Sequence, residues 1–271
     1  MSHPDKNHHT IEPSKTSLAN YHTIEPIKWR NGAKQARRNK DAFMPSSCAR
    51  MFFIGSSESG KTTTLLNAIM KGWLEFDKLY VYSKSLEQDI FRELADFVSE
   101  VAEENSIDKT DLCLMQSSLD HAVSLDEIDP DERPVIILDD VLADRNLRSG
   151  TIDDMFWRGR HKGAIVCELG QSFFAVPKEH RTNGTHYALF DGAVQGDSDM
   201  VALWRAVSGD LKFENFKNLY FGITQMPSAD GKRHEFLFVD KQTSDPRLRY
   251  RWGFDQLLNH DQLVGFGLTH K

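Results

Sequence analysis

A lysine and a threonine directly follow a short loop bounded by two glycines, in the segment GSSESGKT (residues 55–62). Glycine allows backbone angles and close approach that a Cβ would prevent, and the loop's N–H groups converge on an anion. Lys61 would reach the β- and γ-phosphates of ATP, and the Thr62 hydroxyl would bind Mg²⁺. We therefore expect a nucleotide site formed by Gly55, Ser56, Ser57, Glu58, Ser59, Gly60, Lys61, Thr62 and Thr63.

The elements on either side of this loop decide between a phosphate site and an ordinary glycine turn. Residues 51–54 are apolar and predict a buried strand, and residues 63–70 carry apolar side chains at helical spacing. A helix that begins at the loop adds unpaired N–H donors and the positive end of its dipole. The strand, loop and helix together favour the phosphate site.

A second group of candidate residues follows two further apolar segments. Residues 134–138 predict a strand buried on both faces, and this strand ends in Asp139 and Asp140. Polar groups at the carboxyl ends of such strands meet ligands in open α/β sheets. We expect Asp139 to bind Mg²⁺ and Asp140 to orient or deprotonate the attacking water. Gln171, just beyond a strand at 164–169, could hydrogen-bond both that water and the γ-phosphate.

Strands and helices alternate through the rest of the chain, which predicts an α/β fold with a mostly parallel sheet. The apolar patterns predict strands at 78–82, 112–115, 186–190 and 235–240, and helices at 85–101, 152–160, 200–207 and 215–220. Residues 177–183 could be a loop or a short helix. Residues 247–252 mix cations and aromatic side chains, which suits either a strand or a nucleic-acid contact.

Length and composition are those of one large domain or one domain with an appendage, at 271 residues with 27% charged and 39% apolar residues. No segment has the roughly twenty apolar residues of a membrane span, and the first residues lack the apolar core of a secretory signal. Cys48, Cys113 and Cys167 are scattered and odd in number, which favours buried thiols over disulfides or a metal cluster.

The net charge of −7 is unevenly distributed. Residues 28–50 hold seven cations and one anion, whereas residues 84–132 hold fifteen anions and three cations. We expect a flexible basic extension at 1–45, joined to an ATPase domain at 46–271. Its cations Lys28, Arg30, Lys34, Arg37, Arg38 and Lys40 could contact a polyanion such as DNA, or could simply be solvated. The extension repeats the peptide HTIEP at 9–13 and 22–26, as a docking motif or a duplication without function.

The order of four motifs resembles the poxvirus-type genome-packaging ATPases, which belong to the FtsK–HerA branch of P-loop motors in large DNA viruses and virophages. These motifs are GSSESGKTT (55–63), VIILDDV (135–141), GRHKGAIVCELGQ (159–171) and Arg-x-Asn at 181–183, and the resemblance covers roughly residues 46–240. It implies an additional-strand (ASCE-type) P-loop NTPase in which strand 164–169 lies between the phosphate-loop strand and strand 135–139. It also implies a homo-oligomeric ring that drives double-stranded DNA into a preformed capsid, at the host's viral assembly site or in the virion.

The same resemblance suggests roles for individual residues. Lys61 and Thr62 would bind nucleotide and Mg²⁺, Asp139 would bind Mg²⁺, and Gln171 would sense the γ-phosphate. Asp140 would be the catalytic carboxylate, at a position where many proteins of the wider superfamily have Glu. Motors of this kind usually place a further cation on the transferring phosphoryl group. Arg160 is our first candidate for that cation and Arg181 our second.

Two other classes of function share a phosphate loop. A small P-loop kinase would carry an arginine-rich lid after the core strands, which we do not find, and paired carboxylates suit water activation better. A nucleotide switch that binds GTP would need Asn-Lys-x-Asp after a late strand. The Asn-Lys-Asp at 39–41 precedes the phosphate loop and cannot serve.

Overall fold

The computed structural model describes residues 43–45, 48–120, 122–129, 131–141, 150–208, 211–227, 231, 233–243 and 245–266. Within these ranges nine strands form one sheet, in the order β3-β2-β4-β5-β1-β6-β7-β8-β9. Strands β1 to β6 pair in parallel, and β7, β8 and β9 extend one edge in antiparallel fashion. The basic extension lies almost entirely outside the described residues, so the predicted boundary at residue 46 stays a prediction.

The centre of the sheet confirms the predicted additional strand. Strand β5 (Ile165–Gly170) lies between β1 (Arg50–Ile54) and β4 (Pro134–Asp139) and pairs with both in parallel. All six residues of β4 are buried, as its unbroken apolar run predicts for a central parallel strand. The carboxyl ends of β1, β4 and β5 therefore meet at one edge of the sheet.

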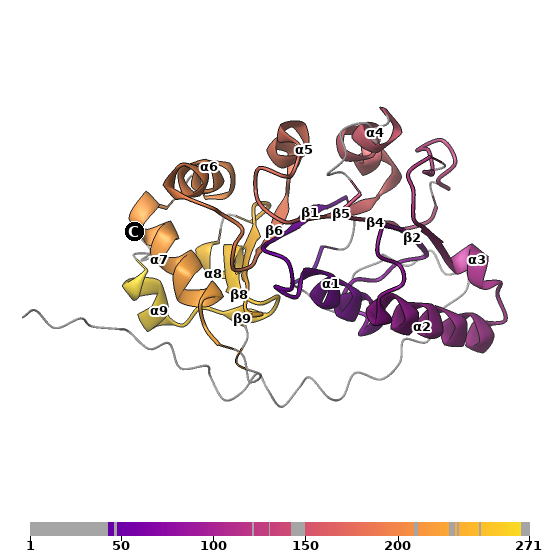
Figure 1. The fold of residues 1–271 in the computed structure, drawn as a ribbon, viewed down its shortest axis with the longest axis horizontal. Helices are drawn as coiled ribbons and strands as arrows, with labels where there is room; N and C mark the ends of the chain where they lie inside the picture. Colours follow the sequence, from indigo (N-terminus) through magenta and orange to yellow (C-terminus); the bar gives the residue numbers. More distant parts are fainter. Residues whose placement is uncertain are drawn as a thin grey trace, which may run out of the picture.

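Helices cover both faces of the sheet. Helices α1 (Lys61–Met70) and α2 (Asp89–Asn105) lie on one face, and α4 (Gly150–Arg158), α5 (Lys178–Asn183) and α6 (Asp197–Val207) lie on the other (Figure 1). Each face has its own hydrophobic core. Leu65, Ile69 and Phe91 belong to one core, and Met155 and Leu203 to the other. The sheet therefore separates the helix that follows the phosphate loop from the α4–α6 layer.

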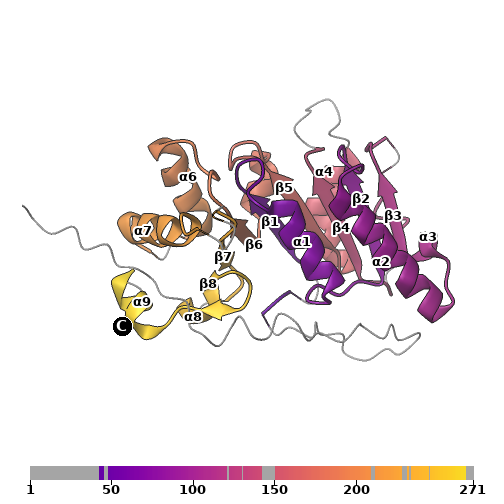
Figure 2. The same cartoon turned by 60° about the horizontal axis from the view of Figure 1, so that its bottom comes forward.

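The remaining elements lie toward the two ends of the sheet. At one end, α3 (Lys109–Leu112) leads into β3 (Cys113–Gln116), which pairs with β2 (Lys78–Ser83). At the other end, α7 lies beside α6, with β8 and α9 close by (Figure 2). The bounds at this end are β6 (His186–Leu189), α7 (Phe213–Thr224), β7 (Leu237–Asp240), α8 (Pro246–Arg249), β8 (Tyr250–Trp252), β9 (Gln256–Leu257) and α9 (His260–Gly265). No described helix combines the length and apolar character needed to cross a membrane.

Several boundaries differ from the sequence prediction for local reasons. Helix α2 begins at Asp89 and not at residue 85, because the Ser83 hydroxyl accepts the Ser85 N–H and holds residues 84–88 in turns. The helix predicted at 152–160 ends at Arg158 and continues as the 3₁₀ turn η3 (Gly159–Lys162). The segment 247–252 is not one strand, because its first half completes α8 and only its last three residues pair with β7.

Candidate ATP site

The phosphate loop is anchored to both strands that flank β1. The Gly55 N–H donates to the Gly170 carbonyl of β5 at 3.1 Å, and the Ser56 N–H donates to the Asp191 carbonyl beyond β6 at 2.9 Å. A Cβ on Gly55 would come within 2.5 Å of the Phe190 side chain, so this close approach requires glycine. Gly60 and Glu58 have positive φ angles of 94° and 61°, the left-handed region that turns the loop into α1.

The predicted loop residues differ in whether their backbone N–H groups are available to bind a phosphate. The Ser56 N–H is used by Asp191, whereas Ser57 and Glu58 are exposed at the tip of the loop. Lys61, Thr62 and Thr63 form the first turn of α1, where the backbone N–H groups have no intrahelical partner. The strongest donors of the predicted set therefore lie at the helix end of the loop.

Lys61 is folded back over the loop that it follows. Its Nζ donates to the Gly55 carbonyl at 2.9 Å and the Ser56 carbonyl at 2.7 Å. The side chain is buried, and burial lowers the pKa of its amine, while the charges of Asp140 and Asp139 act in the opposite direction. Both carboxylates are thus close enough to Lys61 to influence it, which brings the three residues together as predicted.

Asp139 connects the phosphate loop with β2. Its Oδ1 accepts the Thr62 hydroxyl at 3.5 Å, and its Oδ2 accepts the buried Ser83 hydroxyl at 3.0 Å. Burial raises the pKa of Asp139 to about 6, although the hydrogen bond from Ser83 and the charge of Lys61 partly offset this effect. The carboxylate is therefore ionised at neutral pH and oriented by hydroxyl groups.

Asp140 and Gln171 meet across neighbouring strand ends. Asp140 has φ 53°, a left-handed angle that is uncommon for a residue other than glycine. This backbone angle ends β4, and the side chain accepts a 3.3 Å hydrogen bond from Gln171 Nε2. The strain is consistent with a functional constraint, and the contact joins the two predicted groups that would orient water.

The side chains present fit ATP and Mg²⁺. The loop offers backbone donors, the lysine amine and a cradle that a Cβ at Gly55 would fill. The buried Ser59 hydroxyl has no hydrogen-bond partner among the described residues, which is the kind of polar atom that a bound anion satisfies. The Thr62 hydroxyl and the Asp139 carboxylate are the hard oxygen donors that Mg²⁺ prefers. No group of three or more His, Cys, Asp or Glu side chains suited to a metal occurs in the described ranges.

The structure does not bring the two candidate arginines to the phosphate loop of their own chain. Arg160 is exposed in η3, before β5 begins, and so lies at the amino ends of the parallel strands. Arg181 lies on α5, with its guanidinium 4.6 Å from the ring centres of both Phe173 and Phe174. Neither arginine can be assigned to the site of its own subunit on this geometry.

The sequence analysis missed two contacts close to the loop. Ser83 orients Asp139 from β2, and Arg233 forms a 3.1 Å ion pair with Asp191, whose carbonyl anchors Ser56. A small polar residue at the end of β2, beside β4, was the available signal for Ser83. Nothing in the sequence pattern indicates Arg233, because its place depends on how β7 returns along β6.

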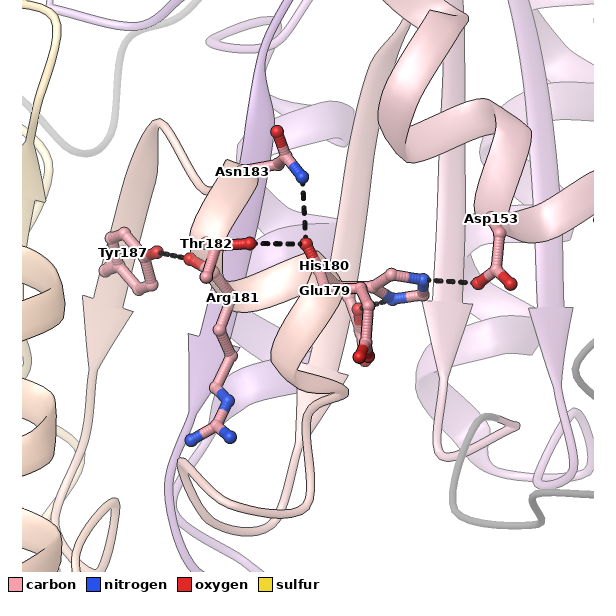
Figure 3. A network of polar contacts seen from close by, with 8 residues as sticks. Asp153, Glu179, His180, Arg181, Thr182, Asn183 and Tyr187 are labelled. Atoms are coloured by element: carbon pink, nitrogen blue, oxygen red, sulfur yellow. Dashed lines mark hydrogen bonds and ion pairs between the residues drawn. The ribbon is translucent and has the colours of Figure 1, made fainter.

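A buried polar network behind the site was also missed. His180 is fully buried on α5 and lies 2.9 Å from Glu168 of β5 and 2.9 Å from Asp153 of α4. Figure 3 shows the His180 side chain reaching from α5 toward Asp153, while the side chain of the next residue, Arg181, points away from it. The Phe156 ring stacks on the imidazole at 3.9 Å between centres. The network ties α4 and α5 to the strand that ends at Gln171.

We expect this network to make stability depend on pH. Burial lowers the pKa of His180, but the hydrogen bonds and charges of Glu168 and Asp153 outweigh burial and raise the pKa above its ordinary value of 6.5. The stabilisation is therefore complete below pH 6.5 and is lost as pH rises through the folded-state pKa. His180→Asn should lower the free energy of unfolding by roughly 3 kcal/mol at pH 6 and flatten its dependence on pH above 6.5.

Denaturant unfolding of both proteins across this pH range measures the effect. Burial lowers the pKa of His186 to about 4, so this residue makes stability rise as pH rises toward 6.5; the effect is common to both proteins and cancels when they are compared. If the free energy of unfolding depends on pH equally in the wild type and the variant, then protonation of His180 does not cause the pH dependence.

The fold and the site together define a P-loop ATPase with an additional central strand. The phosphate loop joins β1 to α1, β5 lies between β1 and β4, and the paired carboxylates end β4. Residues 37–241 match the model of the family described as Poxvirus A32 protein. The match covers most of the chain, and the chain therefore belongs to the poxvirus A32 family.

Family membership confirms the resemblance found in the motifs and, with it, the function. The protein is an ATP-hydrolysing enzyme that packages viral DNA. The kinase and the nucleotide switch are not favoured. No curated protein sequence matches the chain significantly.

Similar solved structures include a viral packaging enzyme and a bacterial protein. The genome packaging NTPase B204 of Sulfolobus turreted icosahedral virus 2, in complex with ATP-gammaS, is 13% identical, with 78% of this chain and 98% of B204 covered and a TM-score of 0.48. VirB4 of Thermoanaerobacter pseudethanolicus is 11% identical, with 78% of this chain and 89% of VirB4 covered and a TM-score of 0.46. Similarity at this level carries no functional argument, and the assignment rests on the family match.

Proposed function

We propose that this packaging ATPase works as a homo-oligomeric ring that uses ATP and Mg²⁺ to drive double-stranded DNA into a preformed capsid. The observation that carries the proposal is the convergence of three pairs of groups at one sheet edge in a member of the A32 family. Lys61 lies over the phosphate loop, Asp139 accepts the Thr62 hydroxyl, and Asp140 accepts the Gln171 amide. Such an edge binds a nucleotide and activates water beside it.

Each side chain has a distinct task in the proposed hydrolysis. Lys61 leaves the carbonyls of Gly55 and Ser56 and neutralises charge on the β- and γ-phosphates. Thr62 and Asp139 hold Mg²⁺, which supplies charge neutralisation on the phosphate oxygens when bound. Asp140 accepts a proton from water or orients it, and Gln171 holds that carboxylate in place.

The cation on the transferring phosphoryl group would come from a neighbouring subunit in this proposal. Arg160 is exposed and remote from its own loop, as a residue that acts in trans must be. Arg181 remains the second candidate, although its guanidinium is held against two phenylalanine rings. A heterologous contact that closes on itself gives a ring.

Mixing two inactive variants tests action in trans. Rings of Arg160→Ala subunits and Asp140→Asn subunits should recover part of the ATPase activity, because some interfaces pair an intact Arg160 with an intact Asp140. Arg158→Ala is the matched control, since Arg158 is exposed on α4 and pairs with Asp154 of its own helix at 3.6 Å. Absence of recovery in mixed rings of normal size would count against Arg160.

ATP hydrolysis with and without double-stranded DNA tests the proposed motor as a whole. We expect DNA of any sequence to stimulate hydrolysis, because a packaging motor must grip phosphates and not base edges. Transfer of phosphate to a small acceptor would support the kinase, and a rate insensitive to DNA would contradict the motor. The capsid as docking partner, and the basic extension at 1–45 as a DNA or capsid contact, belong to the same proposal.

A further inference from the structure

Residues of α5 and α6 line a groove. Both helices lie on the face of the sheet opposite α1 (Figure 1). The groove has a volume of about 520 Å³. Phe173 and Phe174 line it just beyond the carboxyl end of β5, and Lys241 lines it just beyond β7. Because β7 runs antiparallel to β6, Lys241 lies at the opposite edge of the sheet from the phenylalanines. The groove is therefore elongated along α5.

The charged residues that line the groove are all cations. No Asp or Glu lines the groove, whereas four cations do. These are Lys178, Arg181, Arg205 and Lys241. None of the four forms an ion pair with a described residue, whereas Arg92, Arg158 and Lys217 elsewhere on the surface do. Concentrated positive charge of this kind attracts a polyanion even on a protein of net negative charge.

Two cations of the groove are partly buried, and neither forms an ion pair with a described carboxylate. Burial lowers the pKa of Arg181, although the nearby charge of Glu179 acts in the opposite direction, and the buried Nε of Arg181 has no hydrogen-bond partner among the described residues. Burial also lowers the pKa of Lys241, and the neighbouring charge of Arg249 adds to this effect. Leaving such groups unpaired is costly, and a bound anion would remove the cost.

Aromatic rings complete the groove. The Arg181 guanidinium lies 4.6 Å from the ring centres of Phe173 and Phe174, and this contact fixes its position. Phe174 is 51% exposed, which is unusual for so large an apolar side chain. Grooves that follow a nucleic-acid backbone combine cations with aromatic surfaces of this kind.

We propose that this groove binds the sugar–phosphate backbone of one DNA strand, with Lys178, Arg205 and Lys241 on its phosphates and Phe174 against a sugar or base. The inference rests on the proposed DNA translocation and adds a place where the strand is gripped. An acidic protein segment would also match the charge, but it would leave the exposed Phe174 without a role. DNA uses both features, so the observations favour DNA.

The test compares two double variants of the full chain. Lys178→Gln with Arg205→Gln removes two exposed cations of the groove, and Arg92→Gln with Lys109→Gln removes two exposed cations from the α2–α3 side. Binding of labelled duplex and single-stranded DNA of mixed sequence is measured over a range of salt concentrations. The groove variant should lower the log–log salt slope by about 1 for each lost contact, and the control should match the wild type.

Basal ATP hydrolysis and a Phe174 variant provide two further measurements. Basal ATP hydrolysis without DNA should be equal in all three proteins, because none of the changed residues belongs to the ATP site. Phe174→Ala should weaken single-strand binding roughly tenfold if a base stacks on the ring, and should leave duplex binding nearly unchanged.

Equal DNA affinities and equal salt slopes for the groove and control variants would show that the groove does not bind DNA. If DNA still stimulates hydrolysis in that case, the proposed motor function is unaffected. A wild-type protein that neither binds DNA nor responds to it would overturn the proposed function together with the groove. If the groove variant loses binding to a poly-glutamate probe but still binds DNA like the wild type, the ligand of the groove is an acidic protein segment and not DNA.

Discussion

Lys61→Ala is expected to abolish ATP hydrolysis and to weaken ATP binding strongly. The loop backbone positions the phosphates, but Lys61 is the cation that lies over the loop, with its Nζ 2.9 Å and 2.7 Å from two loop carbonyls. Removing a preorganised donor from a phosphoryl-transfer site costs roughly 10²- to 10³-fold in rate, and loss of ground-state binding adds to that cost. Turnover and nucleotide affinity are measured together.

Lys109→Ala is the matched control, since this lysine is exposed on α3 and remote from the loop. Thermal unfolding shows whether the loop variant keeps its fold, because the loop is anchored by Gly55 and Ser56 through bonds that do not involve the lysine. Unchanged turnover in a folded Lys61→Ala protein would refute the ATP site itself.

The sequence predicted those parts of the site that depend on local patterns. The strand, loop and helix from residue 50 to residue 70 follow directly from an apolar run, two glycines and helical spacing. The fully buried β4 with its terminal carboxylates was also visible, because an unbroken apolar run of this length fits a central parallel strand. The place of β5 between β1 and β4 came from the family resemblance, not from periodicity.

Features built by contacts between distant segments could not be predicted in this way. Arg160 precedes the strand predicted at 164–169, so its place at the amino end could have been inferred, but its distance from the phosphate loop could not, because that depends on the folded sheet. His180 lies in a short helix with no amphipathic pattern, and its partners are 12 and 27 residues away. The groove cations come from α5, α6 and the turn after β7, so only the folded sheet brings them together.

Asp139→Asn and Asp140→Asn are expected to fail differently. The change at 139 keeps the shape that Thr62 and Ser83 contact but loses the charge that Mg²⁺ needs, so Mg²⁺-dependent ATP binding should weaken. Because burial raises the pKa of Asp139 to about 6, wild-type Mg²⁺-dependent binding should also weaken as pH falls below 6, and Asp139→Asn should show only the smaller response that comes from the phosphates of ATP.

The Asp140→Asn variant should keep ATP bound and stop hydrolysis. The amide oxygen of the substituted side chain can still accept the Gln171 hydrogen bond, so the geometry at the end of β4 is retained while the base is lost. Loss of general-base help lowers the rate roughly 10²- to 10⁴-fold with little change in affinity, the pattern of an interaction made only in the transition state. Calorimetric binding of ATP with Mg²⁺, together with single-turnover hydrolysis, separates the two variants. If both variants bind ATP and hydrolyse it alike, then adjacent carboxylates that differ this much in burial and partners have the same task, and the division of roles between them is wrong.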